Sequence, residues 1–332
     1  RIENRMFLYK LKWQRREQPI VSAMTHKRPW RSVQVYNPTV VCRDGRYQMW
    51  FLGNGTATRT SDMDLGYAES EDGVNWVEHS QNPILRTGDL PWGRAWQTPH
   101  VLFDVEEDQY KMWFIMADSQ RDKNNEVVFF TQRLGYATSI DGLSWDVHPE
   151  ALLEGGRRPC VLKSGDGSYR MWMNAAPDPE GDFRSAARHI FGFSSPDGLV
   201  WTQDEEPAVQ ATELHRSVVY PFVHRNGSDH TMWYGCHVDG GVFQIYSSTS
   251  DDGVVWQHHH DAPAFEATRD PNHFDGRYTS TPCVLEEADR YLLYYSARDW
   301  GNIYGAGDGT LRVDSDGIYR HIGVAICDKR LP

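Results

Sequence analysis

Acidic residues gather in irregular stretches that surround five repeated proline positions. Some lie ahead of these prolines, and others follow an aromatic stretch; the set we expect to hold the catalytic groups is Asp275, Glu213, Asp299, Asp118 and Asp62. Two carboxyls facing each other across a sugar bond, or one with another proton donor, can cleave a glycosidic bond. Each acid alone is more typical of a solvated loop, so the hypothesis is that two members of the set are catalytic. Asp89 and Asp64 stand in comparable positions.

Arginines form a second pattern in the same stretches. Those ahead of the repeated prolines are Arg94, Arg216 and Arg277, each at five residues, and Arg157 and Arg158, directly before Pro159. Guanidinium groups match carboxylate, sulfate or phosphate. Their convergence would predict an anionic sugar, or phosphate as a co-substrate. The alternative is that they pair with neighbouring acids such as Glu154 and Glu213.

Four other residues complete the candidate binding set. Trp96 and Trp300 are aromatics that do not repeat, and they would either stack on a sugar ring or pack beneath a loop. Asn37 and His100 flank the first two repeated prolines. Because histidine titrates near neutrality, His100 is a candidate general acid or sugar ligand, with a packed channel histidine as the equal alternative.

The sequence pattern of the strands that would position these residues is repeated five times along the chain. The repeated prolines are Pro38, Pro99, Pro159, Pro221 and Pro282, with spacings of 61, 60, 62 and 61 residues. Each proline line is followed by a line such as "YQMWFLG", a third such as "LGYAES" and, in four units, a fourth that ends in tryptophan. Short apolar runs separated by Gly-containing turns predict antiparallel strands. Each unit is therefore a four-stranded meander, and the regular period predicts a propeller or a similar array.

The fourth line is missing after the fifth unit, and a matching stretch stands at the other end of the chain. "LYKLKWQRREQPIVSA" around Trp13 resembles "VNWVEHSQNPILRT" around Trp76. An N-terminal strand that completes the last unit would close a ring and remove its edges. The sequence thus predicts an all-β fold: one five-bladed β-propeller domain over residues 1–332, closed by the N-terminal strand.

The turn "S-x-D-G-x-x-W" precedes each fourth strand. Its acids are Asp72, Asp141, Asp197 and Asp252. A catalytic group is needed only once in a protein, whereas a turn is needed in every unit. We therefore expect these acids and the tryptophans that follow them to have a structural role. Function is expected in the long loops that do not repeat, at the end of the propeller where the proline strands begin.

The amino-acid composition limits the classes of binding partner that we expect. A net charge of -12 argues against a general nucleic-acid or lipid-surface binder, and the chain has no apolar run long enough for a membrane span. The five scattered cysteines suit a reducing compartment, which favours a soluble, cytoplasmic protein. The run His258 to His260 has poor metal-ligand spacing, and no cofactor is expected. The sequence leaves open whether a metal ion lies in the central channel of the propeller, because its ligands would come from separate blades and leave no local motif.

The proline line, the "YxMW" line and the "SxDGxxW" turn resemble the five-bladed propeller glycoside hydrolases, including families 32, 43, 117 and 130. The resemblance covers nearly the whole chain, and "DGRYQMWFLG" and "LGYAESEDGVNW" carry it best. It implies a carbohydrate substrate. The three acids of the family 43 pattern are absent, because Asn37, His100 and Arg157 stand at those positions.

Two functions therefore remain open. The first is an enzyme that cleaves a glycosidic bond with other carboxylates on the same face, acting on a carbohydrate that is acidic if the arginines converge. The second is a non-catalytic propeller that binds a carbohydrate or a protein. A phosphorylase would be distinguished from a hydrolase by its dependence on phosphate.

Overall fold

The computed structural model describes residues 8–24, 28–55, 63–88, 90–121, 127–175, 189–215, 217–238, 240–301, 303–305, 311–313 and 318–330. These residues form 24 strands and two short 3-10 helices, η1 (Leu8–Lys10) and η2 (Pro29–Arg31). The all-β fold predicted from the repeat is confirmed. Within these ranges, neither helix is long and apolar enough to cross a membrane.

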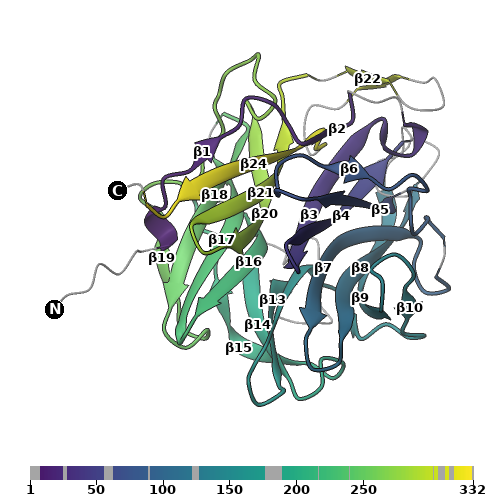
Figure 1. The fold of residues 1–332 in the computed structure, drawn as a ribbon, viewed down its shortest axis with the longest axis vertical. Coiled ribbons are helices and arrows are strands. Elements are labelled where there is room, and N and C mark those ends of the chain that lie inside the picture. Colours follow the sequence, from purple (N-terminus) through teal and green to yellow (C-terminus); the bar gives the residue numbers. More distant parts are fainter. Residues whose placement is uncertain are drawn as a thin grey trace.

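Apart from β22 and β23, the described strands form one nine-stranded sheet and three smaller sheets (Figure 1). We divide the large sheet at its single parallel pair, which gives five sets whose strands pair antiparallel. The first set contains β3 (Gln34–Arg43), β4 (Arg46–Asn54), β5 (Asp64–Ser70) and β6 (Val77–Glu78). The second contains β7 (Ala95–Asp104), β8 (Gln109–Arg121), β9 (Val127–Ser139), β10 (Asp146–Val147) and β11 (Leu153–Glu154). The third contains β12 (Arg157–Lys163), β13 (Tyr169–Ala175), β14 (His189–Ser195) and β15 (Thr202–Val209). The fourth contains β16 (Val218–Asn226), β17 (Asp229–Val238), β18 (Val242–Ser250) and β19 (Gln257–His259).

The fifth set draws strands from both ends of the chain. It contains β20 (Tyr278–Glu286), β21 (Arg290–Arg298), β24 (His321–Asp328), β1 (Gln14–Arg15) and β2 (Val21–Ser22). Gln14 pairs with Ile326, and Val21 pairs with Ile322. Figure 1 shows the purple β1 and β2 beside the yellow β24. A single parallel pair, Phe243 with Tyr278, joins the fourth set to the fifth, and β22 (Ile303–Gly305) pairs only with β23 (Leu311–Val313) among the described strands.

The first strands of the five sets contact one another in a closed cycle. β3 contacts β7, β7 contacts β12, β12 contacts β16, β16 contacts β20, and β20 contacts β3. These five strands carry the repeated prolines. We call the end at which they begin the upper end, and the end at which they finish the lower end.

Each "S-x-D-G" turn is closed by its own side chains. In the first turn, Oδ1 of Asp72 accepts hydrogen bonds from the backbone N–H groups of Val74 at 2.8 Å and Asn75 at 2.7 Å. Asp141, Asp197 and Asp252 accept the equivalent pairs. An aspartate that caps nearby N–H groups in this way fixes a tight turn. The structural role predicted for these four acids is confirmed.

The same turns connect neighbouring sets. The indole Nε1 of Trp50 in β4 donates to the carbonyl of Gly142 at 2.8 Å, and Trp113 in β8 donates to Gly198 at 2.8 Å. Trp172 and Tyr294 make the corresponding bonds to Gly253 and Gly73. In each case the donor lies on the second strand of one set and the acceptor in the turn of the next. Trp233, the fourth member, has a buried Nε1 with no hydrogen-bond partner in the described part of the chain, which fits the missing fifth turn.

A bulge interrupts every proline strand at the same place. The residues directly before the prolines have positive φ: Asn37 at 57°, Thr98 at 39°, Arg158 at 54°, Tyr220 at 62° and Thr281 at 46°. Non-glycine residues seldom adopt this region, and a residue before proline normally prefers extended backbone. Each bulge leaves an N–H group outside the strand ladder. Side chains from neighbouring strands bind several of these groups; for example, Ser296 Oγ accepts from Asn37 at 2.7 Å.

Candidate functional site

The side chain of Arg158 extends among the upper ends of the proline strands, and we call the space that these five strands surround the channel. Its Nη1 donates to Oδ1 of Asn37 at 2.5 Å, and its Nη2 donates to the carbonyl of Pro282 at 2.6 Å. Asn37 in turn donates from Nδ2 to the carbonyl of Pro99 at 3.2 Å. The first, second, third and fifth proline strands are therefore tied together by one layer of polar bonds, which we call the Arg158 layer.

Arg158 carries a buried charge. Its side chain is almost fully enclosed, and desolvation by burial lowers its pKa. The two groups that accept from it are a neutral amide and a backbone carbonyl, and its Nε has no partner among the described residues. Two candidate binding residues, Asn37 and Arg158, are thus brought together, but their polar atoms mainly satisfy each other. At the position where the family 43 pattern has its first-strand acid, this chain has Asn37, whose amide oxygen accepts a hydrogen bond from Arg158.

His100 lies just below this layer and is buried. Its Nε2 lies 3.0 Å from the carbonyl of Val161, so this nitrogen carries the proton. Burial and the charge of Arg158 lower the pKa of His100 to about 3. The imidazole is therefore neutral at physiological pH, which fits the packed histidine better than the general acid.

Two cysteines occupy the position after the proline in other sets. Cys283 Sγ accepts from Val40 N at 3.4 Å, and Cys160 Sγ accepts from Val223 N at 3.2 Å. Burial raises the pKa of Cys160 to about 12 and that of Cys283 to about 11, so both remain thiols. All five cysteines are free, and neither channel thiol neutralises Arg158.

Asp275 lies in the loop that leads into β20 and is fully buried. Its oxygens accept hydrogen bonds from Arg15 Nη1 at 2.7 Å, His273 Nδ1 at 2.6 Å and the Tyr295 hydroxyl at 2.9 Å. Arg15 belongs to β1, so this carboxylate also fastens the N-terminal strand to the fifth set. A buried carboxylate with three donors is held by structure and is poorly placed to meet a ligand.

Asp299 follows the upper end of β21 and remains partly open, with 19% of its side chain exposed. Its Oδ1 accepts from Gly301 N at 2.8 Å, and its Oδ2 lies 3.0 Å from His321 Nε2 and 3.5 Å from Arg320 Nη1. Burial alone would raise the pKa of Asp299, but the hydrogen bond from His321 and the charge of Arg320 hold it below its ordinary value. The group is an oriented carboxylate at neutral pH.

His321 connects this carboxylate to the N-terminal strand. Its Nδ1 lies 2.9 Å from Ser22 Oγ in β2. Burial lowers the pKa of His321, and the charges of Asp299 and Asp275 offset only part of that shift. A neutral imidazole that donates from Nε2 to Asp299 must accept from Ser22 at Nδ1. Two of the predicted acids, Asp299 and Asp275, are therefore brought to the surroundings of one histidine.

The other predicted acids lie apart from this pair. Asp118 lies within β8, three residues before its end, and is half-buried, and Glu213 is exposed in the loop before β16. Asp64 begins β5 and accepts from Thr87 N at 2.6 Å. Asp62 and Asp89 lie outside the described residues.

The predicted arginines differ in their burial and in their contacts. Arg277 lies over the rings of Trp300 and Tyr278, at 5.4 and 5.2 Å from their centroids, and donates to the Gly241 carbonyl at 3.1 Å. Arg157 is half-buried in β12 and Arg94 is exposed. Arg216 lies outside the described residues. Arg277 therefore contacts Trp300, the residue directly after Asp299.

The predicted tryptophans separate into packing and exposed residues. Trp96 is buried, its ring lies 4.6 Å from that of Phe114, and its Nε1 donates to the Arg86 carbonyl at 2.9 Å. Trp300 is 36% exposed and follows Asp299 directly. Trp300 is therefore the more exposed of the two, whereas Trp96 has the contacts of a core residue.

Several residues of this site escaped sequence reasoning. They lie in or directly next to ordinary strands and have no motif around them: His321, Arg320, Ser22 and Arg15. The one available signal was the predicted return of the N-terminal strand to the last unit, which implied that residues near 15–22 would meet residues near 321. No group of three or more His, Cys, Asp or Glu among the described residues could hold a metal ion.

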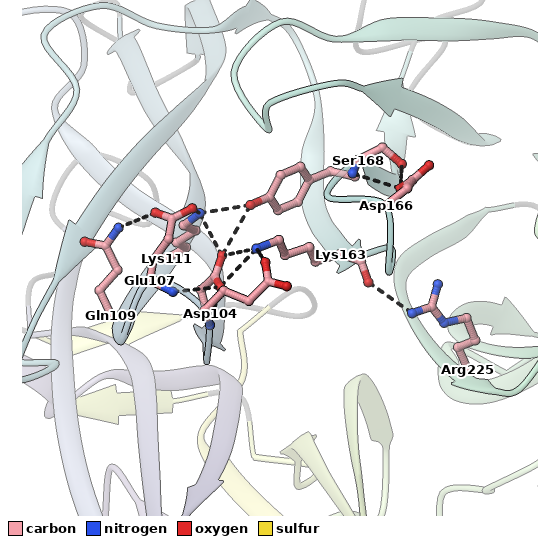
Figure 2. Close-up of polar contacts among 10 residues, drawn as sticks. Asp104, Glu107, Gln109, Lys111, Lys163, Asp166, Ser168 and Arg225 are labelled. Atoms are coloured by element: carbon pink, nitrogen blue, oxygen red, sulfur yellow. Dashed lines mark hydrogen bonds and ion pairs between the residues drawn. The ribbon is translucent and has the colours of Figure 1, made fainter.

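A separate polar cluster lies at the lower end, between the second and third sets (Figure 2). Lys163 Nζ donates to both oxygens of Asp104 at 3.0 and 2.8 Å, and Lys111 Nζ lies 2.8 Å from Asp104 Oδ2. Lys111 also donates to Glu107 at 2.6 Å. Burial would raise the pKa of Asp104, but the two lysines hold it well below its usual range. These bonds join Asp104 and Lys111 of the second set to Lys163 of the third, so the cluster connects the two sets.

Comparison with known proteins supports the fold. No family model matches the chain. A stretch of 145 residues is 25% identical to the uncharacterized protein Rv1502 of Mycobacterium tuberculosis, covering 43% of this chain and 46% of that protein. The match with the related MT1551 protein of another strain has the same extent. The chain therefore spans about half the length of the curated relatives it matches.

Solved structures match over nearly the whole chain. One, from the GH130 family of mannoside phosphorylases, whose glycoside hydrolases target β-1,2 mannosidic linkages in Candida mannan, is 16% identical, covers 97% of this chain and 95% of its own, and has a TM-score of 0.70. An N-acetylgalactosamine deacetylase from F. plautii is 18% identical with a TM-score of 0.66, over 96% and 95% of the two chains. A thermostable family-43 glycoside hydrolase is 15% identical with a TM-score of 0.62, over 93% and 98%. The chain has the fold of the propeller glycoside hydrolases.

Proposed function

We propose that this protein is a carbohydrate-active enzyme that cleaves a glycosidic bond at the upper end of the fold, with Asp299 as its working carboxylate. The observation that carries the proposal is the set of contacts around Asp299: a partly exposed, ionised carboxylate oriented by His321, Arg320 and the Gly301 N–H, with Trp300 beside it. The proposed reaction needs no cofactor.

The architecture belongs to the same proposal. We infer that the five antiparallel sets are the blades of one propeller domain over residues 1–332, and that β1 and β2 close the last blade. The closed cycle of contacts among β3, β7, β12, β16 and β20 supports this interpretation. So does the pairing of β1 and β2 with β24.

Asp299 would act as a base or a nucleophile and not as the acid. Its lowered pKa keeps it ionised at neutral pH, and a carboxylate in that state can activate water or attack the anomeric carbon. Its orientation is fixed by two donors and a nearby cation, so little is left to order when a sugar binds. The proton donor would come from another predicted acid at the upper end, and Asp118 and Glu213 are the described candidates.

The substrate would be a sugar that carries a negative charge. Arg277 lies over the ring of Trp300, the residue directly after Asp299, and Arg320 Nη1 lies 3.5 Å from Asp299 Oδ2. A guanidinium beside an aromatic face suits a sugar that carries a carboxylate or sulfate. Arg157 at the start of β12 would add a third cation.

The test is hydrolysis of a panel of aryl glycosides and acidic oligosaccharides, with and without phosphate. Native protein would be compared with Asp299→Asn, Asp118→Asn, Glu213→Gln and Asp275→Asn. We expect Asp299→Asn to abolish cleavage while sugar binding and thermal stability are kept. Asp275→Asn is the matched contrast, because loss of a buried acceptor for Arg15 should lower stability. Cleavage unaffected by Asp299→Asn would refute the assignment, and dependence on phosphate would indicate a phosphorylase.

A second function is favoured by the Arg158 layer. The position before the first proline holds a neutral amide bonded to an arginine, so this part of the channel offers no carboxylate. A propeller that binds an acidic sugar or a protein without cleaving it would have this arrangement. Binding of an acidic oligosaccharide by the native protein, with no cleavage of any panel member, would support this function over the first.

A further inference from the structure

The lower end of the channel contains a cavity that the proposed function does not use. Its volume is about 750 Å³, and it is lined by residues of all five proline strands that follow the prolines in the chain. The Arg158 layer is made by residues at or just before the prolines, so it lies between this cavity and the upper end. A ligand in the lower cavity would therefore be separate from any sugar beside Asp299.

The walls of the cavity are apolar. The half-buried apolar side chains that line it are Val41, Leu102, Phe103, Leu162, Phe222 and Leu285. At the rim, Val105 has 82% of its side chain exposed. Ligand pockets of this size are commonly lined by apolar side chains with a few polar groups that set orientation. The cavity has those dimensions and that lining.

The charges at the rim already neutralise one another. Arg43 donates to Asp108 at 3.1 Å and lies 4.0 Å from the centroid of the Phe103 ring. Lys163 is bonded to Asp104 and to Glu106. Neither cation is free to select an anionic ligand, and the acids are likewise paired, so the rim does not favour an ion.

Two buried polar residues line the cavity, Thr39 and His100, and Oγ1 of Thr39 already accepts from Val101 N at 3.1 Å. His100 lines it and is more than nine-tenths buried. Its Nε2 is used by the carbonyl of Val161, so Nδ1 is the acceptor nitrogen, and it has no hydrogen-bond partner in the described ranges. The imidazole stays neutral at physiological pH, so this acceptor persists. An acceptor nitrogen that no described residue uses favours a ligand that brings a donor to it.

We propose that the lower cavity binds a neutral, largely apolar molecule whose inner end carries a hydroxyl or an N–H group that donates to His100 Nδ1. The apolar body would lie against Leu102, Leu162 and Leu285 and exclude water from them. The paired charges at the rim would disfavour a charged head group.

Calorimetric titration with two isomers tests this site, because 1-octanol has a hydroxyl donor and heptyl methyl ether has the same atoms without one. We expect the native protein to bind 1-octanol about 2- to 10-fold more tightly than the ether, which is the range of one net hydrogen bond. In His100→Phe, the two isomers should bind alike. Equal affinity of the isomers for the native protein, or binding of neither, would overturn the proposal.

Two further variants keep the test decisive if His100→Phe does not fold. Leu102→Trp places a large ring in the cavity and should weaken 1-octanol binding at least about 10-fold. Val77→Trp on β6 is the matched control, because Val77 is 74% exposed and does not line the cavity. Equal 1-octanol affinity in these two variants would show that the alcohol binds elsewhere. Cleavage assays on Leu102→Trp should match native protein, so this outcome is independent of the proposed enzyme.

Discussion

The Nη1 atom of Arg158 lies 2.5 Å from the amide Oδ1 of Asn37, although 121 positions separate the two residues in the chain. This bond, together with the bond from Arg158 to the Pro282 carbonyl, places a cation across the channel where the resembled family 43 pattern has an acid. The proposed catalytic carboxylate is therefore assigned to another position of the same end.

The first prediction concerns the Arg158 layer. Arg158→Met should lower the free energy of unfolding by about 2–4 kcal/mol, because it leaves the Asn37 amide oxygen and the Pro282 carbonyl buried without their charged donor. Relief of the buried charge offsets only part of that loss. Denaturant unfolding measures the change. The control is Arg157→Met at the half-buried neighbouring position, with an expected change below about 1 kcal/mol. Equal effects of the two substitutions would show that the layer contributes nothing specific.

The second prediction uses two equivalent tryptophans that differ in one bond. Trp113→Phe and Trp233→Phe both remove the indole ring system from a fully buried position, but only Trp113 donates to a turn carbonyl, that of Gly198. Trp113→Phe should therefore cost about 1–2 kcal/mol more, because the Gly198 carbonyl is left unsatisfied. Urea unfolding of both variants measures the difference. If Trp233→Phe is the more damaging, the turn bonds do not hold neighbouring sets together.

The third prediction concerns pH and His100. The unfolded chain takes up a proton at His100 below its ordinary pKa of 6.5, whereas the folded protein resists protonation until about 3. This group therefore supports folding above pH 6.5, and its contribution is lost as pH falls toward 3, by about 1.4 kcal/mol per pH unit. His100→Gln keeps a donor for Val161 and removes the titration. The variant should lose less stability than native protein between pH 6.5 and 4. Parallel stability curves would mean that His100 does not titrate as described.

The fourth prediction concerns the lower polar cluster in Figure 2. Asp104→Asn should destabilise the protein by about 3–5 kcal/mol, because the nearly buried Lys111 loses its main counter-charge. The lowered pKa means that Asp104 supports folding above its ordinary value of 3.8, and that this support is lost as pH falls below it. The control is Asp166→Asn, whose carboxylate bonds only to Ser168 in its own exposed turn among the described contacts. Thermal melts at pH 7 that drop equally for both variants would contradict the assignment.

The fold was accessible from the sequence because its elements are local and repeated. The Asp72 turn is closed by bonds among residues 70–75, and the proline strands carry their own period. The contacts of the candidate site are not local. Asp299 meets His321 across a loop, and His321 meets Ser22 from the other end of the chain. Each of these residues is unremarkable in its own segment, so only the folded arrangement shows that they meet.

The candidate residues illustrate the same limit. Asp275 and Asp299 look equivalent as loop acids, yet one is closed off by three donors and the other keeps an exposed edge. Trp96 and Trp300 look equivalent as non-repeating aromatics, yet Trp96 is packed on Phe114. Burial depends on neighbours from other strands, and a single sequence does not name those neighbours.

The most direct test of the account is the rate at which native protein and Asp299→Asn release reducing sugar from an acidic oligosaccharide at pH 7. We predict measurable release by the native protein and a fall of at least about 100-fold in the variant, with the oligosaccharide still bound by both. Equal rates in the two proteins, or binding by native protein without any release, would contradict the claim that Asp299 is the working carboxylate of a glycosidic enzyme.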